Sequence, residues 1–476
     1  MSETQLLVGP FNRVEGDLEI RLDVAEGRVA SAYVNSPLFR GFERMLLGKG
    51  PRDALTITPR ICGICSISQS AAAARALADA AGVMPPPDGA RVAALLHAVE
   101  NVSDHLVHFN LFFMPDFARM GYQGRAWHDQ VVRRFTALEG SALRQATEAR
   151  AQLLHIVGML GGKWPHTLAI QPGGVTRAPT ARDKVRIGAS LRAFRRYLEE
   201  TVFGAAVEEF AALSSEEAFL NWDRGDAGLF TTVARDLDLA DYGRGQGRYL
   251  SFGAYPTNDG PVFASGQWDN GVLSPLDLSG MVEDHSHAWV LGEGAHPERG
   301  ETLPDEDMRE DAYSWCKAPR LNGQVFETGA LARQVVAGHP LARDLARRGG
   351  VVGRVGGRLL ELALTQIEME RLLAEIHPEA RFMDRVELPR EGEGVGLVEA
   401  ARGALGHWIR IEGGVISSYQ IVAPTTWNFS PRDAGGVAGP VEAALVGAVV
   451  QEGEDTPLPV QHIVRSFDPC MVCTVH

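Results

Sequence analysis

Residues 60–65 read Arg-Ile-Cys-Gly-Ile-Cys, and residues 468–473 read Asp-Pro-Cys-Met-Val-Cys. These two Cys-x-x-Cys pairs, Cys62 with Cys65 and Cys470 with Cys473, contain four of the five cysteines in the chain. Two such pairs of thiols can together form a four-thiolate metal site. Because 405 residues separate Cys65 from Cys470, a shared site would join the beginning of the fold to its end.

The spacing alone leaves three interpretations of the cysteine pairs open. A structural zinc site also uses two Cys-x-x-Cys pairs, but these normally lie ~15–20 residues apart. Two independent redox-active or coincidental pairs would need no shared metal. The third interpretation is a functional metal site that only the complete fold assembles. The fifth cysteine, Cys316, is interpreted as core packing, since buried free cysteines are common.

The composition is that of a soluble globular protein. The chain has 476 residues, of which 45% are hydrophobic and 22% charged, which allows a large core. Its net charge of −14 argues against a nucleic-acid partner, and no apolar run reaches the ~18 residues of a membrane span. The first residues lack a signal-peptide pattern, and the cysteine usage fits a reducing compartment. We therefore expect a cytoplasmic protein, although a folded partner could still carry an export signal.

Hydrophobic periodicity predicts an α+β protein that is predominantly helical, with a central helical bundle and small peripheral β-sheets. Alternating residues predict a β-hairpin over 17–35 and paired strands over 408–411 and 415–419. Because the two cysteine pairs must meet, we expect a single domain over residues 1–476. Helices are predicted over residues 70–82, 88–113, 128–160, 181–213, 328–347 and 354–376.

Six further segments are weak signals individually, but their order and chemistry together are highly specific for one protein family. They are Arg13–Gly16, Phe39–Glu43, Gly173–Thr176, Tyr313–Arg320, Arg402–Trp408 and Pro424–Asn428. With the two cysteine segments and the tail to His476, they resemble the large subunit of nickel–iron hydrogenases. The resemblance covers nearly the whole chain. It implies the fold of that subunit and an enzyme that cleaves H2 heterolytically.

The resemblance also implies the cofactor. All four paired cysteines would bind nickel, with Cys62 and Cys470 as terminal ligands. Cys65 and Cys473 would bridge to an iron that carries one carbonyl and two cyanides, a Ni-Fe(CN)2(CO) centre. Soft thiolates suit these metals. Since one cysteine is left over, the chain has none to spare for iron–sulfur clusters, so a separate cluster-bearing small subunit is required.

Residues that would serve the centre follow from the same resemblance. Glu15 would carry the proton away from Cys470, although a solvated or salt-bridged glutamate is the ordinary alternative. Glu43 and His476 would bind a buried Mg²⁺, a cation that prefers oxygen ligands and water. The hydroxyls of Thr425 and Thr426 would donate hydrogen bonds to the cyanides.

A charged lid is implied as well. Arg402 would lie over the open metal position, with Asp116 and Asp468 orienting its guanidinium. A plain buried ion pair is the alternative for these three residues. His97, His105 and His108, which share one predicted helix, are interpreted as core histidines that at most support the ligands.

Several positions depart from the catalytic pattern of the family. Catalytic members typically carry a histidine four residues after the cysteine that matches Cys65, whereas this chain has Gln69, which cannot carry a proton charge near neutral pH. Ile64 and Phe112 are bulkier than the residues that many catalytic members have there. For Ile64 alone, a neutral core substitution is the alternative. Many members also carry a proline where this chain has Ala400-Ala401.

These departures resemble the regulatory, hydrogen-sensing branch, in which bulky side chains are thought to narrow the gas path. We therefore predict the large subunit of an H2-sensing hydrogenase with slow turnover. Its partners would be an iron–sulfur small subunit, a signalling histidine kinase and maturation chaperones. The alternatives are an energy-conserving uptake hydrogenase and a structural protein stapled by zinc at its four cysteines.

Overall fold

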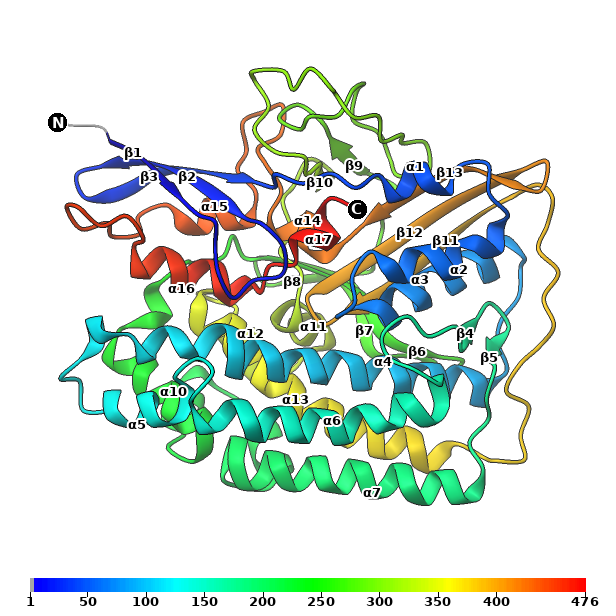
Figure 1. Ribbon diagram of the computed structural model, residues 1–476, viewed down its shortest axis with the longest axis horizontal. Helices are drawn as coiled ribbons and strands as arrows, with labels where there is room; N and C mark the ends of the chain where they lie inside the picture. Colours follow the sequence, from blue (N-terminus) through cyan, green and yellow to red (C-terminus); the bar gives the residue numbers. More distant parts are fainter. Residues whose placement is uncertain (1–3) are drawn as a thin grey trace.

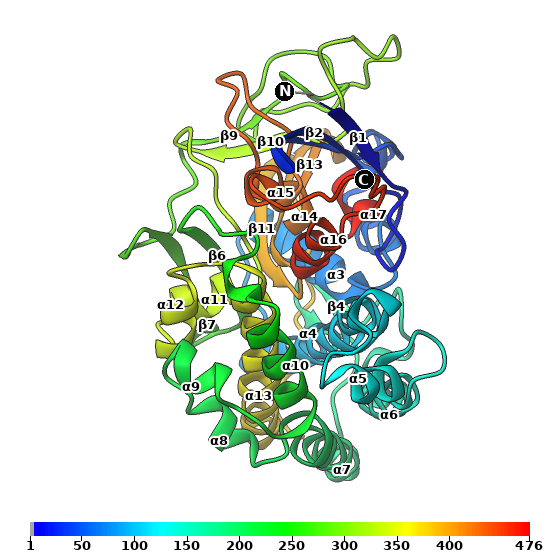
Figure 2. The same cartoon turned by 90° about the vertical axis from the view of Figure 1, so that its left-hand side faces the viewer.

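The computed structural model describes residues 4–476, and Figures 1 and 2 show it from two sides. Long helices fill the lower part of the molecule in Figure 1, and most of the small antiparallel sheets lie above them. The predicted class, a mainly helical α+β protein with small sheets, is confirmed. Within residues 4–476, no helix has both the length and the apolar character that crossing a bilayer requires.

Four long helices form the bundle: α4 (Pro87–Val107), α6 (Ser141–Gly161), α7 (Ala181–Tyr197) and α13 (Val351–Glu375). Helix α4 packs against α13 and α6, and α7 packs against α6 and α13 (Figure 1). Every residue of α13 from Val351 to Ala363 is buried, including three charged ones. A helix enclosed on all sides is typical of the centre of a large protein, and its buried charges must find partners inside.

Within residues 4–476, five small antiparallel sheets accompany the bundle. The hairpin predicted over 17–35 is confirmed as β2 and β3, which turn at Glu26-Gly27. The paired strands predicted near 408–419 are β12 and β13. The sheets are β1 (Thr4–Val8), β2 (Glu19–Ala25) and β3 (Arg28–Asn35); β4 (Ile170–Gln171) and β5 (Gly174–Val175); β6 (Arg248–Thr257), β7 (Gly260–Asp269) and β8 (Val272–Ser274); β9 (Met281–Asp284) and β10 (Ala318–Leu321); and β11 (Gly392–Ala400), β12 (Gly403–Glu412) and β13 (Val415–Val422).

Helix α3 (Ser66–Ala80) lies directly on strand β11, and this contact positions the first cysteine pair. Its side chains toward the sheet are alanines, which allow a close approach. On the facing strand, a Cβ added at Gly394 or Gly396 would lie about 2 Å from a backbone oxygen of α3. Only glycine fits at these two positions, so the strand and the helix are matched to each other.

Shorter helices connect these parts, and three predicted helices are divided. Residues 128–160 form α5 and α6, and residues 181–213 form α7, a π-helical turn and α8. Residues 328–347 form α11 and α12, because Gly338 (φ 90°) and Pro340 end the first and begin the second. The shorter helices are α1 (Phe42–Leu46), α2 (Ala54–Ile57), α5 (His128–Phe135), α8 (Val207–Ala211), α9 (Glu216–Leu220), α10 (Gly225–Asp236), α11 (Ala330–Ala337), α12 (Pro340–Leu345), α14 (Pro424–Asn428), α15 (Pro440–Leu445), α16 (Leu458–Phe467) and α17 (Met471–Thr474).

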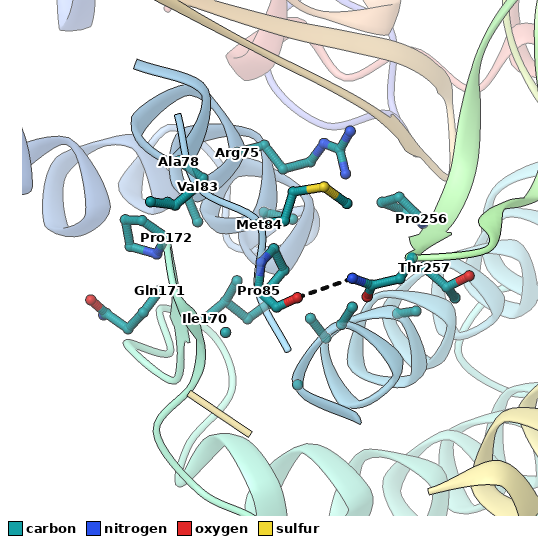
Figure 3. Close-up of a pocket in the computed structure, with 18 of the residues that line it drawn as sticks. Arg75, Ala78, Val83, Met84, Pro85, Ile170, Gln171, Pro172, Pro256 and Thr257 are labelled. Atoms are coloured by element: carbon teal, nitrogen blue, oxygen red, sulfur yellow. Dashed lines mark hydrogen bonds between the residues drawn. The ribbon is translucent and has the colours of Figure 1, made fainter. Parts of the chain in front are cut away.

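One cavity of about 320 Å³ lies beside the C-terminal half of α3 and the start of α4 (Figure 3). Alanine and proline side chains form part of its walls, with Arg75 and Met84 at one side and a hydrogen bond from Asn258 Nδ2 to Pro85 O. None of the site residues predicted from the sequence lines this cavity. The candidate site therefore lies among packed side chains outside this cavity.

The buried carboxyl of Glu442 predicts a pH dependence of stability. It accepts hydrogen bonds from Val34 N and Tyr313 Oη, both at 2.9 Å, and burial raises its pKa from 4.5 to about 7. A raised pKa means that its stabilisation is complete below pH 4.5 and is lost as the pH rises through 7. We expect Glu442→Gln to gain up to about 3 kcal/mol of unfolding free energy relative to wild type between pH 4.5 and 8.

Chemical denaturation of both proteins across this pH range measures the difference. The exposed Glu452→Gln serves as control, because it also removes one carboxyl group but does so at the surface. A difference for Glu442→Gln that does not change with pH would contradict this account of the carboxyl.

Candidate metal centre

The four paired cysteines converge at one buried point. The Sγ atoms of Cys62 and Cys470 are 3.6 Å apart, those of Cys65 and Cys473 3.2 Å, and those of Cys470 and Cys473 3.1 Å. None forms a disulfide, whose sulfurs would be ~2.05 Å apart. Each of the four is at most 6% exposed. The start and the end of the chain therefore meet through these sulfurs, where α17 approaches α3 in Figure 1.

The first pair is held at the N-terminus of α3, where Cys65 is the residue before the first helical turn. No local side chain caps this helix. Instead the carboxylate of Glu100, on α4, accepts hydrogen bonds from the backbone N–H groups of Ile67 and Ser68, each at 2.8 Å. These are among the donors that a helix start leaves without partners. Glu100 thus fixes the cysteine loop to the bundle, and burial raises its pKa to about 7.

The second pair is held by the N-terminal loop. Glu15 and Cys470 form a parallel bridge, in which Glu15 N donates to Pro469 O at 3.3 Å and Met471 N donates to Glu15 O at 2.7 Å. The side chain of Arg40 also links the two cysteine segments, because it donates to Ile61 O at 2.6 Å and to Val472 O. Hydrogen bonds to the backbone therefore hold the two cysteine segments next to each other.

The sulfur set fits a soft metal ion. Hydrogen bonding with Cys470 lowers the pKa of Cys62 and raises the pKa of Cys65 and of Cys473, so these last two thiols hold their protons more firmly than a free cysteine does. Metal binding displaces such protons. The Sγ atoms of Cys62, Cys65 and Cys473 lie within 4.8 Å of one another, and tetrahedral thiolates at ~2.3 Å from a metal are ~3.8 Å apart. The donors and their spacing thus match a thiolate metal centre.

Arg402 lies beside the thiols between two carboxylates. Its Nη1 donates to Asp104 Oδ2 at 2.6 Å, its Nη2 to Asp468 Oδ1 at 3.0 Å, and its Nε to the Asp468 carbonyl at 2.9 Å. Burial alone would lower the pKa of Arg402, but Asp104 and Asp468 raise it well above its usual value. Arg402 is therefore a fixed positive charge next to the sulfurs.

The prediction that Asp116 orients Arg402 is wrong. The carboxylate of Asp116 bonds instead to Arg13, to Arg119 Nη2 at 2.9 Å and to Arg465 Nη1 at 2.7 Å. The helical repeat changes beyond α4, first to a π-helix over 108–113 and then to a 3-10 helix over 114–118. This change carries Asp116 past the centre, toward the N-terminal loop and α16.

Asp104 is the partner that the sequence reasoning missed. It lies on α4 and is 2% exposed. A signal was present in the sequence, because Glu100, Asp104 and His108 follow one another at the four-residue spacing of a helix face. All three are buried, so this spacing places Asp104 in a row of polar side chains along one side of the helix.

A second polar cluster surrounds the last residue of the chain. His476 is 4% exposed, and its Nε2 lies 3.2 Å from Glu43 Oε1. Lys317 Nζ is 3.8 Å from the same oxygen and 2.8 Å from Glu283 Oε2. Burial alone would raise the pKa of Glu43, but Lys317 and His476 lower it to about 2.

This cluster offers unpaired oxygen atoms that could bind a hard cation. Among the atoms of residues 4–476, Glu43 Oε2 and Glu283 Oε1 are buried and have no hydrogen-bond partner. Two carboxylates around one ammonium leave excess negative charge, and unpaired carboxylate oxygens are the ligands that Mg²⁺ prefers. Glu43 and His476 thus fit the predicted magnesium site, with Lys317 and Glu283 as charged neighbours.

Two threonines and Gln69 flank the cysteines. Thr425 Oγ1 accepts a hydrogen bond from Cys470 N at 3.2 Å, and Thr426 Oγ1 donates to Thr474 O at 3.4 Å. Gln69 lies one helical turn after Cys65, and its Oε1 accepts from His407 Nε2 at 2.8 Å. Since Oε1 is engaged, the amide NH2 is the group that Gln69 can offer elsewhere.

The remaining predicted residues lie at the margin of the site. Ile64 is half-buried and packs against the core. Phe112 is half-buried too, and its carbonyl accepts from Arg13 Nη1 at 2.9 Å. The three helix histidines have internal partners: His97 bonds to Ser68 Oγ, His105 to Glu361 and His108 to the Arg465 carbonyl. These hydrogen bonds join the three histidines to other buried groups and not to the cysteine sulfurs.

Known proteins resemble this chain over nearly its whole length. The family model described as nickel-dependent hydrogenase matches residues 40–120 and 142–476. The chain is 30% identical to the periplasmic [NiFeSe] hydrogenase large subunit of Desulfomicrobium baculatum, over 100% of this chain and 95% of that protein. It is 28% identical to the uptake hydrogenase large subunit of Rhodobacter capsulatus, over 99% of this chain and 95% of that protein. The crystal structure of the reduced, active Ni-Fe-Se hydrogenase from Desulfomicrobium baculatum superimposes with a TM-score of 0.86 at 30% identity, covering 99% of this chain and 100% of that one.

Single serine substitutions test the sulfur cluster. We expect Cys62→Ser and Cys473→Ser each to abolish stoichiometric metal binding, because a neutral hydroxyl cannot replace a thiolate at a soft metal. Elemental analysis of the purified protein gives the metal content. Cys316→Ser is the matched control, because Cys316 is equally buried, lies outside the cluster and has a pKa that burial raises. Unchanged metal content in Cys473→Ser would contradict the four-thiolate site.

Proposed function

The chain belongs to the nickel-dependent hydrogenase family as a large subunit that activates H2, and we propose that it senses H2 with slow turnover. The convergence of Cys62, Cys65, Cys470 and Cys473 beside Arg402 supports the chemistry. Gln69 is the observation that favours a sensor, since an uncharged amide replaces the titratable histidine expected at this position. The half-buried Ile64 and Phe112 support the same proposal, as bulky groups near the cysteine loop and α4.

We propose that Cys62 and Cys470 are terminal nickel ligands and that Cys65 and Cys473 bridge to an iron with one carbonyl and two cyanides. When bound, this centre supplies the Lewis acidity that polarises H2. The protein contributes the fixed charge of Arg402 on one side. Thr425 and Thr426, both buried, provide hydroxyls for the cyanides.

Proton removal is proposed to run through Cys470 Sγ and then Glu15. The backbone of Glu15 is bonded to the residues on either side of Cys470. Its carboxyl is half-buried, and burial together with the nearby Cys62 raises its pKa. A carboxyl whose pKa is raised toward neutrality can both accept and release a proton, which a relay requires.

Hydrogenase large chains pair with a small subunit, and this chain leaves only Cys316 outside the proposed ligand set. We propose that iron–sulfur clusters reside in that partner alone. The buried cluster of Glu43 and His476 is proposed to bind Mg²⁺. A signalling histidine kinase as further partner, maturation chaperones and a cytoplasmic location complete the proposal for a sensor.

An energy-conserving uptake hydrogenase is the second candidate. It is favoured by the names of similar proteins, among them the uptake hydrogenase large subunit of Rhodobacter capsulatus. The two candidates share the metal centre and differ in turnover rate, so one preparation can decide between them.

The purified heterodimer provides the test of the proposed function. We expect infrared bands of metal-bound carbonyl and cyanide, together with a specific activity for H2 oxidation far below that of an uptake enzyme measured alongside. Metal-loaded protein without such bands would refute the nickel–iron centre. Bands accompanied by high specific activity would refute the sensor and favour the uptake enzyme.

Gln69→His tests the residue that separates the two candidates. We expect shifted carbonyl and cyanide bands or an altered activity under O2, because an imidazole one turn after Cys65 introduces a titratable donor. Gln366→His is the control, since Gln366 is buried in α13 and bonds to Leu191 O. Identical spectra and identical O2 behaviour in Gln69→His would remove Gln69 as a tuning residue.

A further inference from the structure

Arg402 stands in a tight turn that is buried. Ala400 pairs with Gly403, so Ala401 and Arg402 are the two turn residues between β11 and β12. Most turns lie at the surface, where water satisfies their backbone groups. Here Ala400, Ala401 and Arg402 are each 3% exposed. The carbonyl oxygens of this turn therefore need donors from the protein.

Arg333, on α11, supplies these donors. Its Nη1 donates to Ala400 O at 2.7 Å, and its Nη2 donates to Ala401 O at 2.9 Å. These are the two carbonyls immediately before Arg402. The side chain of Arg333 is completely buried, so its planar donors hold the turn without competition from water.

Two carboxylates neutralise Arg333 and fix its orientation. Glu361 receives a bidentate pair, from Nε at 2.8 Å and from Nη2 at 2.6 Å. Glu399, the residue before Ala400, accepts from Nη1 at 2.8 Å. The bidentate bond sets the plane of the guanidinium. The position of Glu361 on α13 therefore determines where the Arg333 guanidinium lies, and the guanidinium holds the turn.

The same network reaches the carboxylate on the other side of Arg402. Glu361 Oε2 lies 2.9 Å from His105 Nε2. His105 follows Asp104 on α4, and Asp104 accepts the 2.6 Å hydrogen bond from Arg402 Nη1. Two routes therefore join this network to Arg402. Arg333 bonds to the backbone just before Arg402, and Glu361 bonds to His105, the neighbour of the Asp104 that pairs with Arg402.

We propose that Arg333 is a positioning residue for Arg402: it fixes the buried turn and thereby the guanidinium that faces the thiols. Arg333 makes no hydrogen bond to any of the four cysteines, so it acts through Arg402. The inference rests on the role proposed for Arg402 in H2 activation and does not depend on whether the protein is a sensor. A purely structural ion pair is the competing explanation.

Substitution in the metal-loaded heterodimer separates the two explanations. Arg333→Lys keeps the charge, but one ammonium cannot span two carbonyls and two carboxylates. We expect kcat for H2 oxidation to fall about 10–100-fold with KM for H2 unchanged, the loss typical of groups that orient a site. The carbonyl and cyanide infrared bands should shift, since the charge near the metals moves.

Arg134→Met is the matched control for lost stability. Arg134 also forms a bidentate bond, at 2.7 and 2.6 Å to Asp226, but it joins α5 to α10 and does not touch the turn. We expect this control to lower the unfolding temperature and to leave kcat and the infrared bands at their wild-type values. Wild-type kcat and unshifted bands in Arg333→Lys would overturn the proposal.

Glu361→Gln decides the question if Arg333→Lys does not fold. The amide preserves the shape of Glu361 and weakens its hold on Arg333, so a smaller loss of kcat with a band shift in the same direction is expected. Wild-type kcat and bands would overturn the proposal here too.

Arg402→Lys distinguishes the proposed role of Arg402 from its positioning by Arg333. Wild-type activity in Arg402→Lys would refute the role of Arg402. Loss of activity in Arg402→Lys, with wild-type activity in Arg333→Lys and Glu361→Gln, would refute the positioning by Arg333.

Discussion

The meeting of four thiols from opposite ends of the chain is the constraint on which the structure depends. Cys470 lies 405 positions after Cys65, yet the sulfurs of the four cysteines lie within a few ångströms of one another. Backbone contacts achieve this, through Arg40 between the two cysteine segments and Glu15 beside Cys470. The metal site can therefore exist only when the first and last segments have both docked, which couples folding to cofactor binding.

Buried ion pairs surround this point. Leaving a charge unpaired in the interior costs several kcal/mol, so Arg402 requires Asp104 and Asp468, and Arg333 requires Glu361. Such pairs contribute little net stability compared with apolar packing. What they provide is geometry, because bidentate and multiply bonded guanidinium groups hold one orientation. The interior thus gives up stability to hold a positive charge in a fixed place beside the sulfurs.

The sequence was sufficient for the fold class and for the cysteine pairs, because periodicity and ligand spacing are local signals. Regular helix spacing does not place Asp116 correctly, because the helical repeat changes at 108–113 and brings Asp116 to Arg465, whereas Asp104 lies before this change. The apolar pattern continues across the break at Gly338, so it predicts one longer helix where the structure has two. The role of Arg333 was also invisible, since it depends on a turn that becomes buried only in the assembled fold.

Anomalous diffraction from crystals of the metal-loaded heterodimer, recorded at the nickel and iron absorption edges, tests the central claim most directly. The account predicts a nickel peak among the sulfurs of Cys62, Cys65, Cys470 and Cys473 and an iron peak next to Cys65 and Cys473. A single zinc peak at the four sulfurs, or nickel bound elsewhere in the chain, would contradict it.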